Sequence, residues 1–285
     1  MKAKTQILFR ADGNSQIGLG HVVRSLALAE LLCPDFDCTF AIQNPSPEIS
    51  AQIKTICPEI INLPENKTAL LNEAELIAGK LTGKEIIVLD GYQFPTEYQQ
   101  ILKQKGSILV CLDDLHDRHF VADAIINIAG GVKPEAYSVE PYTKLYLGPA
   151  YALLRKPFRE ARKTLSERPS KVQSILICFG GADPENFTLK TLEKIQKTNP
   201  ALNLEVVLGS AYTHTAALQN FIAAHANIRL HQNLSAEEMA ILMEQCEVAI
   251  TSASSVAYEY CAVNGMLFLE KTAANQHDLY EFLLA

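Results

Sequence analysis

The chain has 285 residues, of which 48% are apolar and 20% are charged. This composition excludes a disordered or collagen-like chain and, at roughly 150 residues per domain, predicts about two domains. The 25 basic and 32 acidic side chains give a formal net charge of −7, which argues against nucleic acid or an anionic membrane as a partner, since both require a basic surface.

The apolar segments and the cysteines indicate the cellular compartment of the chain. No apolar run approaches the roughly 20 residues of a membrane span, and the short apolar stretch near the N-terminus does not resemble a signal peptide. The seven cysteines include no C-x-x-C pair, so we expect buried, reduced thiols rather than a disulfide framework or a metal site. We expect a cytoplasmic protein, with no cofactor and no obligate protein partner.

Short apolar runs alternate with helix-like segments along the whole chain. The runs consist mostly of Ile, Leu and Val without polar alternation, as in strands that are buried on both faces of a parallel sheet. In chain order the predicted strands are 6–10, 38–42, 85–90, 107–113, 124–128, 172–179, 204–209, 227–230, 248–252 and 266–270. The first crossover has helical spacing up to Leu32. Repeated strand–helix units predict an α/β fold with open parallel sheets.

A polar, charge-rich stretch divides the chain into two halves. It spans Arg155–Arg168 and is followed by Pro169 and Ser170. We interpret it as a linker between an N-terminal Rossmann-like domain, residues 1–165, and a C-terminal one, residues 166–285. Two α/β domains in series predict an interdomain cleft at the carboxyl ends of both sheets.

The loop after the first strand contains Gly18 and Gly20, and His21 follows at the start of a helix. It does not match a dinucleotide fingerprint, which needs a third glycine where Val23 stands. Nor does it match a P-loop, which needs a lysine where Leu19 stands. The partial positive charge of a helix N-terminus disfavours an imidazolium. A neutral His21 is therefore a candidate general base for water.

Other residues of this loop are candidates for contact with a ligand. Asp12 and Asn14 are placed to orient the ring of His21 or a substrate. Gly18 and Gly20 would allow the backbone to approach a ligand closely. The alternative interpretation is a capping histidine with polar surface neighbours.

Two further strand ends carry glycine or carboxylate pairs. Gly180 and Gly181 follow the first strand of the second half, where backbone amides can face an anion. A tight turn with a helix start at Asp183–Pro184 is the alternative there. Asp113 and Asp114 suggest a metal site, but adjacent carboxylates point apart on a strand, so we expect none.

The last two strand ends carry hydroxyl and amide side chains. Ser254 and Ser255 begin a helix, where free amides, the helix dipole and hydroxyl donors together suit an anion. Glu259, one turn later, is placed to accept two hydroxyls of a ribose. A plain capping arrangement explains the same spacing. Asn275 and Gln276 are candidates for bonding sugar hydroxyls, or are simply polar residues at a helix start.

Taken together, the motifs resemble those of the UDP-sugar hydrolases of pseudaminic acid biosynthesis, the PseG family, which is related to the MurG-type glycosyltransferases. The resemblance covers nearly the whole chain. The motifs are R-x-D at 10–12, Q-I-G-x-G-H-x-x-R at 16–24, D-x-Y at 90–92, D-D at 113–114, G-x-x-Y-A-L-L-R at 148–155, C-x-G-G-x-D at 178–183, S-A-S-S at 252–255 with the glutamate at 259, and N-Q at 275–276.

The resemblance implies a GT-B fold, in which two Rossmann-like domains face a cleft. It also implies hydrolysis of UDP-2,4-diacetamido-2,4,6-trideoxy-β-L-altrose to UDP and the free sugar. By the same resemblance His21 is the base for water, and Tyr92 and Asn275 lie at the sugar site. The glycine at position 91 departs from the family pattern, in which a bulkier residue is expected.

The resemblance further assigns Ser254 and Ser255 to the diphosphate and Glu259 to the ribose. We expect metal-free hydrolysis, because the helix start at Ser254 and the Gly180 and Gly181 amides can meet the diphosphate charge. We expect water to attack the anomeric carbon with inversion, because retention needs a nucleophile on the protein and no carboxylate of the His21 loop except Asp12 is a candidate. One alternative is a MurG-type glycosyltransferase, which needs an acceptor. Another is a non-catalytic UDP-sugar-binding module, which needs no base.

Overall fold

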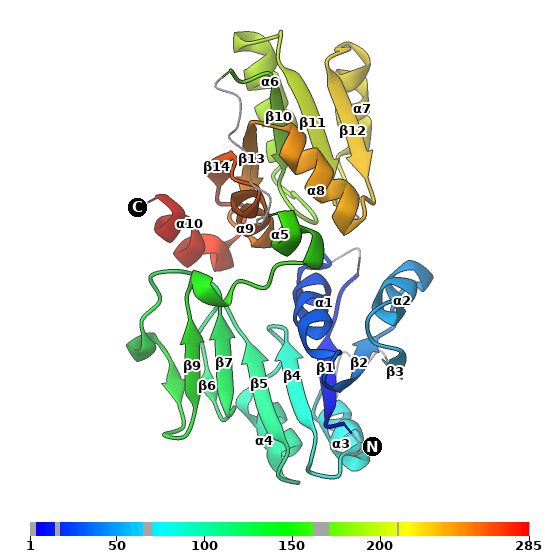
Figure 1. Cartoon of the computed structure of the whole chain (residues 1–285), viewed down its shortest axis with the longest axis vertical. Helices are drawn as coiled ribbons and strands as arrows, with labels where there is room; N and C mark the ends of the chain where they lie inside the picture. Colours follow the sequence, from blue (N-terminus) through cyan, green and yellow to red (C-terminus); the bar gives the residue numbers. More distant parts are fainter. Residues whose placement is uncertain (1–3, 15–17, 65–69, 162–170, 210, 285) are drawn as a thin grey trace. The chain divides into compact units, whose positions relative to one another are not determined.

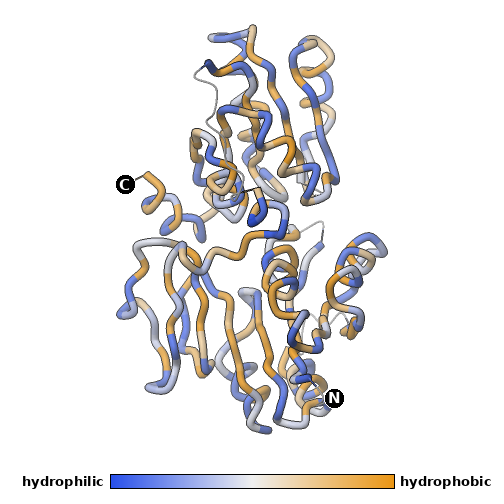
Figure 2. Tube along the Cα trace, in the orientation of Figure 1, coloured by the Kyte–Doolittle hydropathy of each residue, from blue (hydrophilic) through white to orange (hydrophobic). Residues whose placement is uncertain are grey.

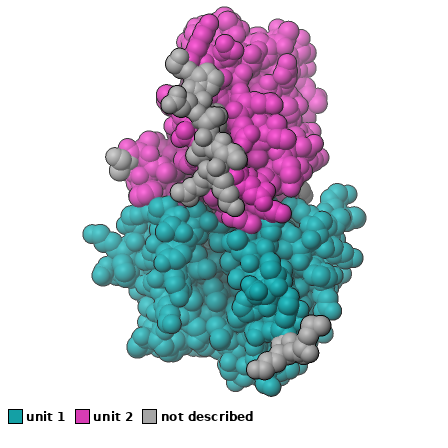
Figure 3. Space-filling view, viewed as in Figure 1, with its two compact units in different colours: residues 1–14, 21–153 teal, residues 15–20, 154–285 magenta. Residues whose placement is uncertain are grey.

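The computed structural model describes residues 4–14, 18–64, 70–161, 171–209 and 211–284. These residues form two compact units, which Figure 3 shows in different colours: Met1–Asn14 with His21–Leu153, and Ser15–Gly20 with Leu154–Ala285. The predicted boundary near residue 165 lies outside the described residues. The first part of the predicted linker is described, and it forms a helix, Lys156–Ala161, that belongs to unit 2.

In its described part, unit 1 contains a seven-stranded parallel sheet with the order β3-β2-β1-β4-β5-β7-β9 (Figure 1). Its strands are β1 Gln6–Ala11, β2 Asp37–Gln43, β3 Glu59–Leu63, β4 Ile86–Asp90, β5 Ile108–Leu112, β7 Ala124–Asn127 and β9 Lys144–Leu147. Two short strands, β6 His119–Phe120 and β8 Ser138–Val139, pair separately. Its helices are α1 Gly20–Leu32, α2 Pro47–Lys54, α3 Leu70–Lys80 and α4 Thr96–Lys103.

The strand order of unit 1 reverses at β1, which pairs with β2 on one side and β4 on the other. Right-handed crossovers therefore place α1 and α2 on one face of the sheet and α3 and α4 on the opposite face. The tube in Figure 2 shows that the central strands are mostly apolar, as strands covered on both faces must be. Helix α1 buries Val22, Leu26 and Ala29, which share one face at helical spacing.

The described part of unit 2 contains a five-stranded parallel sheet with the order β12-β11-β10-β13-β14. The strands are β10 Ser174–Cys178, β11 Asn203–Leu208, β12 Ile228–Gln232, β13 Val248–Ser252 and β14 Met266–Glu270. The helices are α5 Lys156–Ala161, α6 Phe187–Thr198, α7 Thr215–Ala223, α8 Ala236–Gln245, α9 Ser255–Ala262 and α10 His277–Leu284. The order reverses at β10, so α6 and α7 cover one face and α8 and α9 the other.

The ten predicted strands are all present, and the expected α/β class with parallel sheets is confirmed. Four described strands were not predicted: β3, β6, β8 and β9. Strands β6 and β8 have only two residues each. Strands β3 and β9 lie at the two edges of the first sheet and are only partly buried, so their sequences lack a continuous apolar run. The alternative helix start at Asp183–Pro184 is wrong, because the helix begins at Phe187 with Asn186 as its N-cap.

Two expectations from composition can be compared with the structure. Cysteines 38, 57, 111, 178 and 246 are buried free thiols, as expected, whereas Cys33 is half-buried and Cys261 is exposed. Within the described ranges, no helix has both the length and the apolar character that crossing a membrane requires.

The turn that leads into β4 is fixed by a buried carboxylate. Glu85 accepts hydrogen bonds from the backbone amides of Thr82, Gly83 and Lys84 and from the Thr82 hydroxyl, at 2.7 to 3.1 Å. Burial raises the pKa of Glu85, but these donors outweigh it and hold the pKa at about 2. A β-carbon built at Gly83 would lie 2.0 Å from the carbonyl oxygen of Lys105, so only glycine fits this turn.

We predict that Glu85→Gln lowers the free energy of unfolding at pH 7 by about 1–3 kcal/mol, because charge-assisted hydrogen bonds are lost. The folded pKa of about 2 lies below the unfolded value of about 4.3. The stabilisation is therefore complete above about pH 5 and declines as the pH falls toward 2. Urea denaturation at pH 7 and pH 3 measures both differences, with the exposed Glu75→Gln as control. A difference that stays constant with pH would contradict this role.

Candidate active site

The strand order places the end of β4 beside the end of β1, where the first crossover begins. Ala11 pairs with Asp90 in this register, and α1 starts at Gly20. Such a reversal point, at the carboxyl ends of parallel strands, is where α/β sheets bind ligands. Asp90 closes β4 and His21 opens α1, so the topology brings together two side chains that are 69 positions apart.

His21 and Asp90 form a hydrogen-bonded pair. The Nδ1 atom of His21 lies 2.7 Å from Oδ1 of Asp90, whose side chain has no exposed surface. An ionised carboxylate can only accept, so we assign the proton of the neutral ring to Nδ1. Nε2 then keeps its lone pair, and the imidazole, 17% exposed, has the protonation pattern of a general base oriented by a carboxylate.

Asp90 is kept ionised by donors from α1. Arg24 donates to its two oxygens through Nε at 2.9 Å and Nη2 at 2.5 Å, and the Ser25 hydroxyl donates at 3.2 Å. Burial raises the pKa of Asp90, but the Arg24 guanidinium and the bond to His21 outweigh it, and the pKa lies below its ordinary value. The carboxylate is therefore available as an acceptor for His21.

Tyr92 and Asp114 complete this cluster. The rings of His21 and Tyr92 meet edge to face, with centroids 4.7 Å apart and planes at 83°. The Tyr92 hydroxyl donates to Oδ2 of Asp114 at 3.2 Å, and Arg24 donates to the same oxygen at 3.2 Å. Burial and the Asp114 carboxylate raise the pKa of Tyr92, so its hydroxyl stays protonated and acts as a donor.

The other candidates of the first loop are placed differently. The Asp12 carboxylate accepts hydrogen bonds from both terminal nitrogens of Arg10, from the backbone amide of Gln43 and from the side chain of Gln93, at 2.5 to 2.9 Å. The carboxylate that pairs with His21 is thus Asp90, and Asp12 belongs to a separate buried network. Asn14 is exposed.

The two glycine loops meet within unit 2, which includes residues 15–20. Gly18 has a positive φ of 80°, and a β-carbon built at Gly181 would lie 3.3 Å from the Gly18 Cα. Nothing surrounds a β-carbon built at Gly20. Gly180, with φ of 83°, abuts the Ser252 hydroxyl. The two backbone segments therefore approach each other closely at these glycines, and an anion site here stays a prediction.

The serine-rich helix start adopts the predicted arrangement. Helix α9 begins at Ser255, and Ser254 is its N-cap residue but makes no side-chain capping bond. The Ser254 hydroxyl instead lies 3.0 Å from the Ser252 hydroxyl. Ser254 thus occupies the N-cap position, as the alternative interpretation expected, but its hydroxyl does not cap the helix. Two paired hydroxyls lie at the positive end of the helix instead.

Glu259 has a partner that the spacing did not indicate. Arg155 donates to its two oxygens through Nε at 2.7 Å and Nη2 at 2.8 Å. The Glu259 side chain is only 6% exposed. Each carboxylate oxygen has a second lone pair, so this pairing leaves acceptor capacity on both oxygens.

The final pair of candidates lies in a short turn before α10. Asn275 and Gln276 belong to a 3₁₀ turn, Ala274–Gln276, and both are half-buried. The Gln276 side chain accepts from the backbone amide of Thr272 at 2.8 Å, which closes the loop after β14.

The sequence motifs contained two residues whose contacts only the structure reveals. Asp90 orients His21, and Arg24 holds Asp90 in place. One signal was available, because Arg24 stands three positions after His21, so that both lie on one face of α1. Asp113 and Asp114 have separate partners, Tyr137 and Tyr92. In the described residues, no group of three or more His, Cys, Asp or Glu side chains is arranged to hold a metal ion.

Comparison with known proteins adds to this geometry. No family model matches the chain. A UDP-2,4-diacetamido-2,4,6-trideoxy-beta-L-altropyranose hydrolase of Campylobacter jejuni is 28% identical over 263 residues, which cover 89% of this chain and 87% of that protein. The resemblance to the nucleotide-sugar hydrolases is confirmed.

Two further comparisons set the limits of this resemblance. An uncharacterized protein of Methanocaldococcus jannaschii is 26% identical over 264 residues, and this chain spans only 53% of its length. The crystal structure of MurG from Acinetobacter baumannii matches with a TM-score of 0.61 and 13% identity, over 98% of this chain and 83% of that one. This likeness confirms the expected fold class of two Rossmann-like sheets, while the cleft between the domains stays a prediction.

We predict that ¹⁵N NMR finds the proton of the neutral His21 ring on Nδ1, because the Asp90 carboxylate can only accept. Asp90→Asn should abolish this fixed tautomer, since an amide can either donate or accept. The exposed Asp35→Asn is the matched control and should leave the spectrum of His21 unchanged. A wild-type ring protonated on Nε2 would contradict the assignment.

Proposed function

We propose that the chain hydrolyses a UDP-linked 2,4-diacetamido-2,4,6-trideoxy hexose of the β-L-altrose type to UDP and the free sugar, in pseudaminic acid biosynthesis. The observation that carries the proposal is the pairing of His21 with the buried Asp90 at 2.7 Å. A UDP-sugar-binding module would have no use for a histidine oriented in this way. The Campylobacter jejuni hydrolase, 28% identical, supports the choice of substrate.

In this proposal His21 removes a proton from water. The Asp90 carboxylate accepts the Nδ1 proton, which leaves the Nε2 lone pair for the water molecule. The ring becomes an imidazolium as water attacks, and the adjacent carboxylate stabilises that charge without itself being protonated. The rings of Tyr92 and His21 meet edge to face, and we assign Tyr92 to the sugar.

Nucleotide binding is assigned to unit 2. The amides at the start of α9 and the paired hydroxyls of Ser252 and Ser254 are donors for the diphosphate. We assign the ribose hydroxyls to Glu259, whose orientation Arg155 fixes by two hydrogen bonds. Because backbone and hydroxyl donors meet the diphosphate charge, we propose turnover without a divalent metal.

We further propose attack at the anomeric carbon with inversion. A base-activated water gives a single displacement, which inverts, whereas retention needs a nucleophile on the protein. Asp12 was the candidate for that nucleophile. Its two oxygens accept four hydrogen bonds from Arg10, Gln43 and Gln93, which reduces its nucleophilicity and favours direct attack by water.

A MurG-type transferase remains the alternative on the same fold. The likeness to MurG concerns the fold alone, and a fold of this kind supports several reactions. A base at His21 would serve an acceptor hydroxyl as well as water, so the choice of hydrolysis rests on the similarity to the Campylobacter jejuni hydrolase. The cytoplasmic location stays a prediction.

We predict that the chain releases UDP from this UDP-sugar without an acceptor and in the presence of EDTA. His21→Ala should lower kcat by about 10²- to 10⁴-fold and leave the affinity for UDP unchanged, because the base acts on water. A UDP-release assay and calorimetry with UDP measure the two quantities. The exposed His277→Ala is the matched control and should match wild type.

Three results would count against this function. Release that requires an acceptor would favour the transferase. A strict Mg²⁺ requirement would contradict the metal-free proposal. A His21→Ala variant within threefold of wild type would remove His21 from the mechanism.

We predict that hydrolysis in ¹⁸O-labelled water puts the label in the sugar, because carbon–oxygen cleavage leaves the original oxygen on UDP. Rapid NMR of the first product should find the anomer opposite to that of the substrate. Mass spectrometry of both products follows the label. Label in UDP, or a first anomer that matches the substrate, would refute the mechanism.

A further inference from the structure

Arg118 connects the loop after β5 to the turn after β4. Its Nη1 atom donates to the carbonyl oxygens of Tyr92, at 2.9 Å, and Phe94, at 3.1 Å. The remaining nitrogens face Asp117, with Nε at 2.8 Å and Nη2 at 3.3 Å. One guanidinium therefore binds two backbone carbonyls of a turn that carries a residue of the candidate active site.

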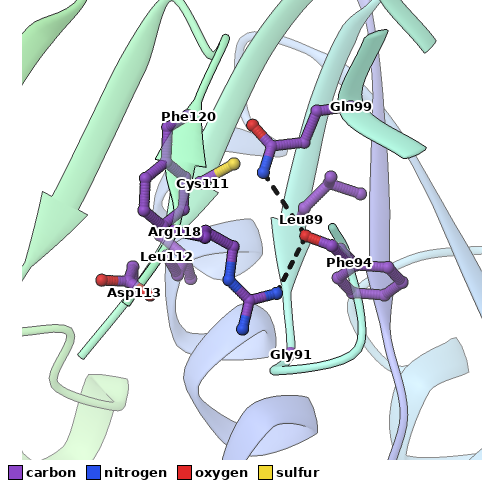
Figure 4. A pocket seen from close by; sticks show the side chains of 9 residues that line it. All are labelled: Leu89, Gly91, Phe94, Gln99, Cys111, Leu112, Asp113, Arg118 and Phe120. Carbon is purple, nitrogen blue, oxygen red and sulfur yellow. Dashed lines mark hydrogen bonds between the residues drawn. The ribbon is translucent and has the colours of Figure 1, made fainter. Parts of the chain in front are cut away.

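The packing behind this turn has one small gap. A cavity of about 10 Å³ lies there, enough for a single water at most. Figure 4 shows Arg118 and Gln99 reaching the Phe94 carbonyl from two sides, with Leu89 and Cys111 near the cavity. Where side chains leave a gap, directional hydrogen bonds fix the position of the backbone.

The residues on either side of Arg118 explain why that position matters. Tyr92 lies on the turn, and Asp114 lies on the same loop as Arg118. The Tyr92 hydroxyl bonds to Asp114 at 3.2 Å while its ring meets His21 edge to face at 4.7 Å. Arg118 therefore joins the loop that carries Asp114 to the turn that carries Tyr92.

Gly91 shows how closely this turn is packed on its other side. A β-carbon at position 91 would lie 2.5 Å from Oε1 of Gln93 and 3.0 Å from the ring of the buried Phe94. A larger residue would displace Gln93, which donates to Asp12 at 2.9 Å. The glycine that departs from the family pattern is thus required by the same turn that Arg118 holds.

We propose that Arg118 is a positioning residue for the candidate active site, acting through Tyr92. It binds the backbone of the turn and holds the Tyr92 ring against His21. Its kinetic consequence rests on the proposed hydrolysis, whereas its structural consequence, the placement of the Tyr92 ring, does not. This difference allows two independent tests.

The kinetic test is a double-mutant cycle on acceptor-free UDP release. Arg118→Met should lower kcat about tenfold in the wild-type background and by less than twofold in a Tyr92→Leu background, a coupling within the usual range for residues that act together. Arg118→Lys, which keeps a donor, should retain most of the kcat that Arg118→Met loses. Asp117→Asn, which removes only an exposed ion pair, should match wild type. The affinity for UDP should not change in any variant.

The second test needs no activity. The edge-to-face contact places His21 in the ring current of Tyr92, so the Cε1–H resonance of His21 should move in Arg118→Met toward its position in Tyr92→Leu. Asp117→Asn should not move it. If Arg118→Met does not fold, Arg118→Gln takes its place in both tests.

The outcomes separate the two proposals. If the wild-type chain releases no UDP, the proposed hydrolysis is wrong. The position of the His21 resonance then still tests the role of Arg118. Equal losses of kcat in both backgrounds, or an unmoved His21 resonance, would overturn the positioning role.

Discussion

A fully buried carboxylate, Asp90, joins the sheet of unit 1 to its first helix. It closes β4, and it accepts hydrogen bonds from three side chains of α1, those of His21, Arg24 and Ser25. Helix α1 cannot shift along β4 without leaving a buried charge unpaired, which costs roughly 3–5 kcal/mol. The Arg24–Asp90 pair therefore does two things. It holds α1 against the sheet, and it orients the carboxylate that binds the His21 ring.

A second buried cation ties β1 to the opposite face of the sheet. Arg10 has no exposed surface and donates to Asp12 and to Glu73 on α3, while Tyr98 on α4 donates to the same glutamate. Asp12 also accepts from Gln93, one residue beyond Tyr92. The turn after β4 is thus attached to this network on one side and to Arg118 on the other, which gives a surface tyrosine, 38% exposed, a defined position.

The parts of the structure that followed from the sequence are those governed by short-range patterns. Interior strands read as apolar runs, and the start of α9 at Ser255 follows from residues adjacent in the chain. The edge strands β3 and β9 lacked that pattern because one side of each faces no neighbour in the sheet. His21 was found from its place at a helix start, but its partner was not, since 69 residues separate it from Asp90 and 104 separate Arg155 from Glu259. Only the strand order, with β4 beside β1, brings the first pair together.

The charges around His21 do not cancel. Arg24 contributes one positive charge, and Asp90 and Asp114 contribute two negative ones, so with a neutral ring the cluster carries one excess negative charge. Uptake of a proton by the ring brings the cluster to neutrality. The same excess favours a ligand with a cationic group beside His21 over a neutral ligand of equal shape, which makes amines a rational starting point for inhibitors of this site.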